Sequence, residues 1–162
     1  MSLAIVYTRA ALGIEAPLIT VEVHLSNGLP GLTMVGLPET TVKEARDRVR
    51  SALINSGYAF PAKKITINLA PADLPKEGGR YDLPIALALL VASEQLNTTR
   101  LNQYEFVGEL ALTGGLRGVP GAIPSAMEAI KAGRRIVVSS DNAAEVGLIG
   151  GSDCLVADHL QE

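Results

Sequence analysis

Cysteine, tryptophan and histidine are scarce in this sequence. Its 162 residues include one cysteine, Cys154, two histidines, His24 and His159, and no tryptophan. A single cysteine excludes an internal disulfide, and we expect Cys154 to be buried because it lies in the short apolar run CLVA. The histidines are far apart and belong to no recognised ligand cluster, so we expect no metal site. We expect His24 at the surface or at the edge of a sheet.

Long hydrophobic runs are also missing. Although 48% of the residues are hydrophobic, no run approaches the roughly 20 apolar residues that span a bilayer. The first residues, MSLAIVYTRAALGIEAP, lack the basic start and the sustained apolar stretch of a secretory signal. We therefore expect a cytoplasmic protein without membrane contact. The length fits one domain over residues 1–162, and the abrupt end at HLQE suggests a piece of a longer protein.

Charge is unevenly distributed along the chain. The net charge of −3 argues against a dedicated nucleic-acid-binding module, because such modules are usually basic. However, residues 43–64 carry a local balance of +4, and residues 137–162 carry −5. Such asymmetry can orient a domain against a partner, and the alternative is a solvated helix face.

The apolar pattern predicts an α/β sandwich. Alternation over 21–25 and 65–69 predicts two strands, and a capping box at Thr41–Glu44 opens a helix that Gly57 ends. The apolar stretch 83–92 predicts a central buried helix capped by Asp82. Beyond it we expect a strand over 106–112, a helix over 124–131, a strand over 135–139, a short helix capped by Asp141 or Asn142 that runs through Leu148, and a strand at 155–156. This order favours a mixed sheet with helices on one or both sides.

The usual catalytic and nucleotide-binding motifs are absent. Gly31 and Gly36 have the spacing of a P-loop, but Leu37 and Pro38 stand where its Lys and Ser/Thr are needed. No serine lies in a Gly-x-Ser-x-Gly turn. Asp73, Glu77 and Asp82 are close in sequence, and we interpret them as helix-capping rather than acid–base groups.

The most unusual stretch is NLAPADLPKEGGRYDLPIALALL, residues 68–90. Its loop presents Lys76 and Arg80 before a helix, where exposed amides and basic side chains could bind an anion. The alternative is a loop whose glycines only permit a sharp turn.

This stretch, with LPGLTMVGLPETTVKEARDRVRSAL and VGELALTGGLRGVPGAIPSA, closely resembles the N-terminal region of the ComM family. These are competence-associated, magnesium-chelatase-like proteins of bacteria, and the resemblance covers the whole chain. It implies that an AAA+ ATPase domain lies downstream, outside this chain, and that ATP and Mg²⁺ are cofactors of the full-length protein but not of this part. It also implies a ring-forming homo-oligomer, a hexamer, that acts on DNA as a helicase or branch-migration motor in natural transformation.

More distantly, the chain is similar to the protease domain of Lon and to the C-terminal domain of RadA, which share the fold of the second domain of a small-subunit ribosomal protein. Lon-type proteases use a Ser and Lys dyad. The resemblance puts Arg80 at the position of the serine and Ile123 at the position of the lysine, so it implies no catalytic residue here.

The sequence therefore predicts a non-catalytic interaction and assembly domain of a ComM-type ATPase. Two alternatives stay open, a divergent Lon-like peptidase and a subunit of a metal-chelatase-like complex. The candidate residues for contact with DNA phosphates or with an acidic partner are Lys43, Arg46, Arg50, Lys63, Lys64, Lys76 and Arg80. One candidate for such an acidic partner is the C-terminal part of the chain, with Asp141, Glu145 and Asp153.

Overall fold

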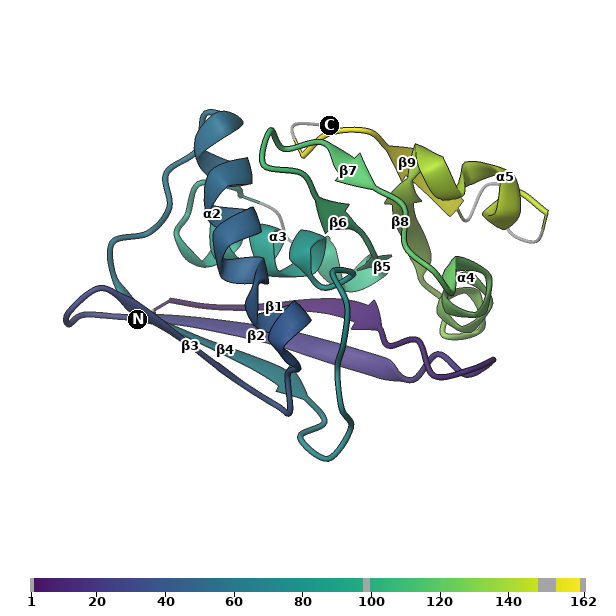
Figure 1. Cartoon of the computed structure of the whole chain (residues 1–162), viewed down its shortest axis with the longest axis horizontal. Coiled ribbons are helices and arrows are strands. Elements are labelled where there is room, and N and C mark those ends of the chain that lie inside the picture. Colours follow the sequence, from purple (N-terminus) through teal and green to yellow (C-terminus); the bar gives the residue numbers. More distant parts are fainter. Residues whose placement is uncertain (1, 98–99, 149–153, 161–162) are drawn as a thin grey trace.

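The computed structural model describes residues 2–97, 100–148 and 154–160 (Figure 1). The strands are β1 (Ser2–Arg9), β2 (Leu18–Ser26), β3 (Gly31–Val35), β4 (Lys64–Ala70), β5 (Tyr104–Phe106), β6 (Glu109–Leu110), β7 (Leu116–Arg117), β8 (Arg135–Ser139) and β9 (Cys154–Ala157). The α-helices are α1 (Thr40–Lys43), α2 (Ala45–Asn55), α3 (Asp82–Ala92), α4 (Ala122–Lys131) and α5 (Ala143–Val146). Short 3₁₀ turns are η1 (Leu101–Gln103) and η2 (Ser140–Asn142). In the described residues no helix is long and apolar enough to cross a membrane.

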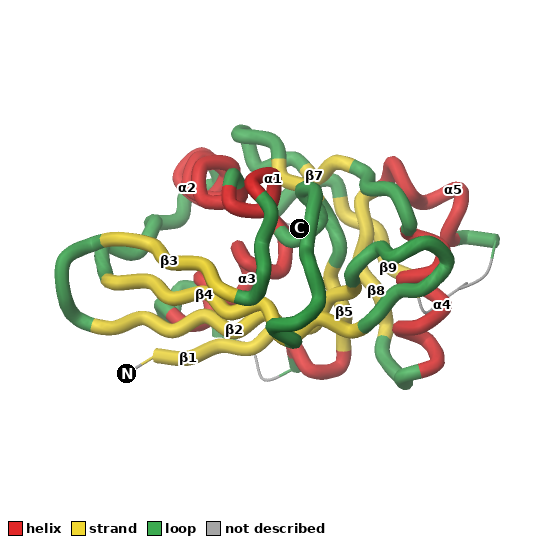
Figure 2. The backbone as a smooth tube through the Cα atoms, turned by 60° about the horizontal axis from the view of Figure 1, so that its bottom comes forward, coloured by secondary structure: helices red, strands yellow, loops and turns green. Residues whose placement is uncertain are grey.

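A seven-stranded mixed sheet forms the centre of the fold, in the order β3-β4-β2-β1-β5-β8-β9. Strands β1, β2 and β4 pair antiparallel, whereas β3 with β4 and the run β1-β5-β8-β9 pair parallel. Figure 2 shows the sheet running from β3 at one end to β8 and β9 at the other. The predicted α/β sandwich with a mixed sheet is confirmed.

The first half of the chain packs α2 and α3 on one face of β1–β4, as Figure 1 shows. Alternation works as predicted, because every second side chain of β2 and β4 points into this core and is buried. Helix α3 is apolar almost all round and buried along most of its length, as expected for a central helix. His24 is half-buried in β2, which lies between β1 and β4, so it is not at a sheet edge.

The second half of the chain places α4 on the opposite face of the sheet. Ala4, Val6 and Ala10 of the β1 segment pack into the first core, whereas Arg9 points the other way and donates to the Glu128 carbonyl oxygen in α4. A smaller apolar cluster forms there from Val107, Val119, Ala122, Ala126, Ala129, Ile136, Val138 and Val146. Helices therefore cover both faces of the sheet.

Three local predictions need correction. The Thr41–Glu44 capping box does not form, because Thr41 lies inside α1 and accepts a hydrogen bond from the Gly78 N–H instead. Cys154 is half-buried rather than buried, because β9 is the last strand of the sheet. The short helix at the C-terminal end stops at Val146, and no side chain caps it. The Asn142 side chain instead bonds the Val119 N–H and carbonyl oxygen.

The strand predicted over 106–112 is divided into two. Strand β5 ends at Phe106, and β6 pairs with β7 in a separate two-stranded sheet. The chain leaves the main sheet at Gly108, whose N–H donates to the Arg80 carbonyl oxygen while its own carbonyl oxygen accepts from the Leu83 N–H. This turn brings Glu109 next to the loop before α3.

Candidate functional site

A basic groove runs between α2 and the edge strand β3. Arg46, Arg50 and Lys63 line it together with the apolar residues Leu32, Ile54, Phe60 and Ile65. Lys43 and Arg46 extend the lining along Leu32, Thr33 and Met34 of β3. All four basic side chains belong to exposed residues, and the Arg50 guanidinium lies 5.9 Å from the Phe60 ring centroid. The structure thus brings these four predicted contact residues onto one surface.

Lys64 and Lys76 occupy different positions relative to this groove. Lys64 is exposed at the start of β4, next to Lys63. Lys76 is fully buried, so its predicted presentation to an anion is wrong. Its ammonium group donates to the carbonyl oxygens of Gly36 and Pro71, and burial lowers the pKa of Lys76. The side chain therefore ties two loops together.

The loop that receives Lys76 is held close to β4. Gly36 has a φ of 107°, and a Cβ at this position would lie 2.1 Å from the Leu69 carbonyl oxygen, so only glycine fits. Next to it, the Lys76 N–H donates to the Leu37 carbonyl oxygen, and the Glu39 N–H donates to the Lys76 carbonyl oxygen. This pairing fixes the loop 71–79 against the chain that leads into α1.

Arg80 is also buried, with 3% of its surface exposed, and its predicted presentation to an anion is wrong for the same reason. Its guanidinium donates to the Arg9 carbonyl oxygen at 2.9 Å, the Pro120 carbonyl oxygen at 2.7 Å and the Ser125 hydroxyl at 2.7 Å. Burial lowers the pKa of Arg80. Ile123, the position that the Lon resemblance aligns with the dyad lysine, is half-buried in the first turn of α4. The positions aligned with the Lon dyad are therefore occupied by Arg80, which joins β1 to α4, and by Ile123, which has an alkyl side chain. Neither residue provides a nucleophile.

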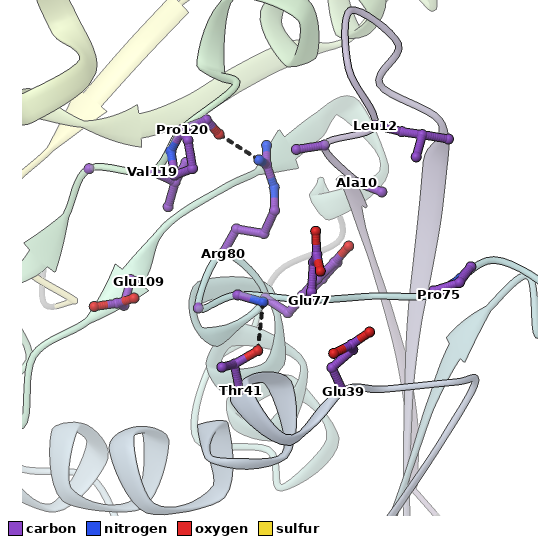
Figure 3. A pocket seen from close by; sticks show the side chains of 15 residues that line it. Ala10, Leu12, Glu39, Thr41, Pro75, Glu77, Arg80, Glu109, Val119 and Pro120 are labelled. Carbon is purple, nitrogen blue, oxygen red and sulfur yellow. Dashed lines mark hydrogen bonds between the residues drawn. The ribbon is translucent and has the colours of Figure 1, made fainter.

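A cleft of about 520 Å³ lies where the loops at 10–12, 39–41, 75–81 and 118–120 meet (Figure 3). The lining is mostly apolar, with Leu12 and Pro120 among its walls. In Figure 3 the Arg80 side chain reaches Pro120, with Glu39 and Glu77 on one side of it and Glu109 on the other. No lining residue in the described part of the chain other than Arg80 is a lysine or arginine. No group of three or more His, Cys, Asp or Glu side chains in this part could hold a metal ion.

Asp82 follows the lining residue Tyr81 in the chain, and the prediction that its side chain caps α3 is wrong, because no side chain makes a capping hydrogen bond there. Its carboxylate accepts hydrogen bonds from the Arg48 guanidinium at 2.6 and 3.1 Å and from the Leu110 N–H at 3.1 Å. Burial raises the pKa of Asp82 to about 6, although the bonds from Arg48 and Leu110 act in the opposite direction. The hydrogen bond to Asp82 is the main cause that raises the pKa of Arg48.

The raised pKa of Asp82 predicts a pH-dependent stability. The native state binds a proton at Asp82 more tightly than the unfolded chain does. The contribution of Asp82 to the free energy of unfolding is therefore greatest below pH 4. This contribution is lost as the pH rises to about 6, by up to about 3 kcal/mol. Urea denaturation at several pH values should show this decrease in the wild-type protein, and Asp82→Asn should remove it. Parallel profiles for the two proteins would contradict the assignment.

Sequence reasoning missed the buried ion pair that joins the two halves of the sheet. Glu105 of β5 accepts from Arg9 of β1 at 2.7 and 2.9 Å and from Arg134 at 3.1 Å. It also missed the cleft, because Glu39, Glu77 and Glu109 are distributed over 71 positions and belong to no spacing pattern. The glycines at 78, 79 and 118 could have indicated the cleft in the sequence, because their backbone, which carries no side chain, lines part of it.

The fold places the chain among mixed α/β domains, and comparisons with known proteins identify the family. A family model described as subunit ChlI of Mg-chelatase matches residues 21–142. Competence protein ComM of Haemophilus influenzae is 61% identical over 160 residues, which are 99% of this chain and 31% of that protein. YifB of Escherichia coli K12 is 80% identical over 161 residues, 99% of this chain and 32% of that protein. A Mycobacterium tuberculosis H37Rv protein is 38% identical over 154 residues, which are 94% of this chain and 31% of that protein.

The chain belongs to the magnesium-chelatase ChlI family and is of the ComM-like type. It spans about a third of the length of the curated relatives that it matches.

Proposed function

We propose that this chain is a non-catalytic interaction and assembly domain of a ComM-type AAA+ protein, and that its basic groove contacts DNA phosphates. In this proposal the ATP- and Mg²⁺-binding ATPase domain lies in the part of the relatives that the chain does not cover. The domain spans residues 1–162 and works in the cytoplasm within a hexameric ring that moves along DNA during natural transformation. The name of the Haemophilus influenzae relative, a competence protein, supports this context.

The observation that carries the proposal is the gathering of basic side chains around one groove. Lys43, Arg46, Arg50 and Lys63 line it, and Lys64 is exposed beside it. None of the salt bridges among the described residues involves these side chains, so their charge is available to a polyanion. A phosphate backbone releases bound counterions when such cations replace them, which makes binding dependent on salt. Lys76 and Arg80 take no part in this surface because they are buried.

Charge reversal tests the DNA contact. The double variant Arg46→Glu, Lys63→Glu is expected to raise the dissociation constant for duplex or single-stranded DNA about tenfold or more and to reduce the salt slope by about 2. Fluorescence anisotropy at several salt concentrations measures both quantities.

The matched control is Arg117→Glu, Lys131→Glu, which changes the net charge equally at exposed positions away from the groove. This control should keep most of the affinity. Equal losses in the two double variants would indicate a response to net charge alone, and no loss in either would exclude the groove as a DNA contact.

A further inference from the structure

The cleft between the loops at 10–12, 39–41, 75–81 and 118–120 lies apart from the basic groove. The residues that line the two sites do not overlap, and α1 lies between them, with Thr41 on the cleft side and Lys43 on the groove side. The volume of the cleft, about 520 Å³, is within the range of ligand-binding sites, which combine apolar walls with a few converging polar groups. Neither the ATPase assignment nor the DNA contact uses this cleft.

Glu39 and Glu77 are not neutralised by Arg80, the one lysine or arginine among the described residues that line the cleft. Arg80 directs its guanidinium to the Arg9 and Pro120 carbonyl oxygens and to the Ser125 hydroxyl. Glu39 and Glu77 are exposed and form no salt bridge among the described residues. Their charges therefore favour a cationic ligand at the mouth of the cleft.

Glu109 adds a third carboxylate on the opposite side. It is half-buried, and its carboxylate lies so close to Gly79 that a Cβ on this glycine would be 2.1 Å from a Glu109 oxygen. The absence of a side chain at position 79 thus lets this carboxylate lie against the cleft wall. Because the carboxylates do not converge as metal ligands do, the site suits an extended organic cation.

Tyr81 gives a second and independent indication of a ligand. This residue lines the cleft and is 1% exposed, yet its hydroxyl makes no hydrogen bond to any described residue. The hydroxyl oxygen itself is not fully buried, so this unpaired group faces the open side of the cleft. Burial raises the pKa of Tyr81 to about 12, and the charge of Glu77 acts in the same direction. The neutral phenol is therefore available to accept a hydrogen bond from an N–H donor.

We propose that this cleft binds the side chain of a lysine or arginine from an extended protein segment. The apolar walls, with Leu12, Pro75 and Val119, take the alkyl stem of that side chain. The carboxylates of Glu39, Glu77 and Glu109 and the Tyr81 hydroxyl accept hydrogen bonds from its charged end. The cleft is then a docking point for a basic segment of a partner protein, and it operates independently of the DNA contact.

The test uses two small probes of nearly the same shape, one with a charged guanidinium and one with a neutral urea group. N-acetyl-arginine methylamide is titrated into the ¹⁵N-labelled 162-residue chain, with N-acetyl-citrulline methylamide as its neutral counterpart. The arginine probe should shift the amide signals of Gly78, Gly79 and Gly118 with a dissociation constant in the millimolar range, and the citrulline probe should bind several-fold more weakly. Equal shifts from both probes, or no saturable shift from either, would overturn the proposal.

Two variants locate the binding. Glu77→Gln should weaken the arginine probe about twofold to fivefold, since one exposed charge pair is removed. Tyr81→Phe keeps the ring and removes only the hydroxyl, and it should weaken binding without unfolding the protein. Glu128→Gln, which alters a surface pair with Lys131 outside the cleft, should have no effect. An equal effect of Glu128→Gln and Glu77→Gln would show that the probe responds only to overall charge and would overturn the site.

Discussion

Replacing Glu105 by alanine is expected to lower the free energy of unfolding by about 3–5 kcal/mol, because it leaves a buried charge without its partner. Glu105 is fully buried, and it accepts two hydrogen bonds from Arg9, whose side chain is 9% exposed. The same carboxylate accepts a bond from Arg134. Urea denaturation followed by far-ultraviolet circular dichroism measures the loss, since the sequence has no tryptophan for fluorescence.

The matched control for this prediction is Arg134→Ala. Arg134 is partly exposed, and its guanidinium lies 4.1 Å from the Tyr7 ring centroid. Removal of the Arg134 side chain leaves Glu105 paired with Arg9. Its loss should therefore cost clearly less than that of Glu105, about 1 kcal/mol. If Glu105→Ala costs no more than Arg134→Ala, the buried pair does not hold the two halves of the sheet together.

The position of this ion pair explains the size of the expected effect. Strand β1 pairs with β5 at only one register position, Tyr7 with Glu105, whereas it pairs with β2 along its whole length. The contact between β1 and β5 joins the antiparallel first half of the sheet to the parallel second half. With so little strand pairing, the bonds from Arg9 to Glu105 and to the Glu128 carbonyl oxygen have a large share in joining the two halves.

Elements with strong local signals could be predicted from the sequence. Strands β2 and β4 alternate apolar and polar residues, helix α3 is an apolar run, and Gly57 and Gly133 end helices with positive φ. These patterns depend on nearby residues only. The division of the strand predicted over 106–112 was not predictable in this way, because it depends on hydrogen bonds between Gly108 and residues of the α3 segment.

The residues of the candidate site were predictable to the same extent, where their positions depend on nearby residues alone. Lys43, Arg46 and Arg50 lie within two turns of a helical segment, so their common surface could be inferred from spacing. Lys76 and Arg80 looked equally accessible in sequence, since glycines and charged residues surround them. Their burial depends on carbonyl oxygens that are distant in the chain, such as Gly36 for Lys76 and Pro120 for Arg80. Charge in a loop therefore does not establish exposure when distant backbone acceptors are present.

Arg80→Met is expected to destabilise the protein by about 3–5 kcal/mol. Methionine keeps much of the volume of the arginine stem, so the packing loss is small. However, the Arg9 carbonyl oxygen and the Ser125 hydroxyl lose their donor in a buried setting, at about 1–3 kcal/mol for each unsatisfied group. The Pro120 carbonyl oxygen also loses its donor, but at the partly exposed wall of the cleft. Urea denaturation of the variant measures the loss.

Two further variants separate the lost hydrogen bonds from the lost side chain. Arg80→Lys keeps the charge but offers one compact donor group in place of a planar fork, so it should recover only part of the stability. Ser125→Ala removes one of the acceptors, and in the double variant with Arg80→Met the combined loss should be smaller than the sum of the single losses by about 1 kcal/mol. Strictly additive losses, or an Arg80→Met variant as stable as the wild type, would contradict the bridging role. A large loss in Arg80→Met together with a non-additive loss in the double variant means that Arg80 acts from the interior of the fold. There it joins β1 to α4 and forms one wall of the cleft.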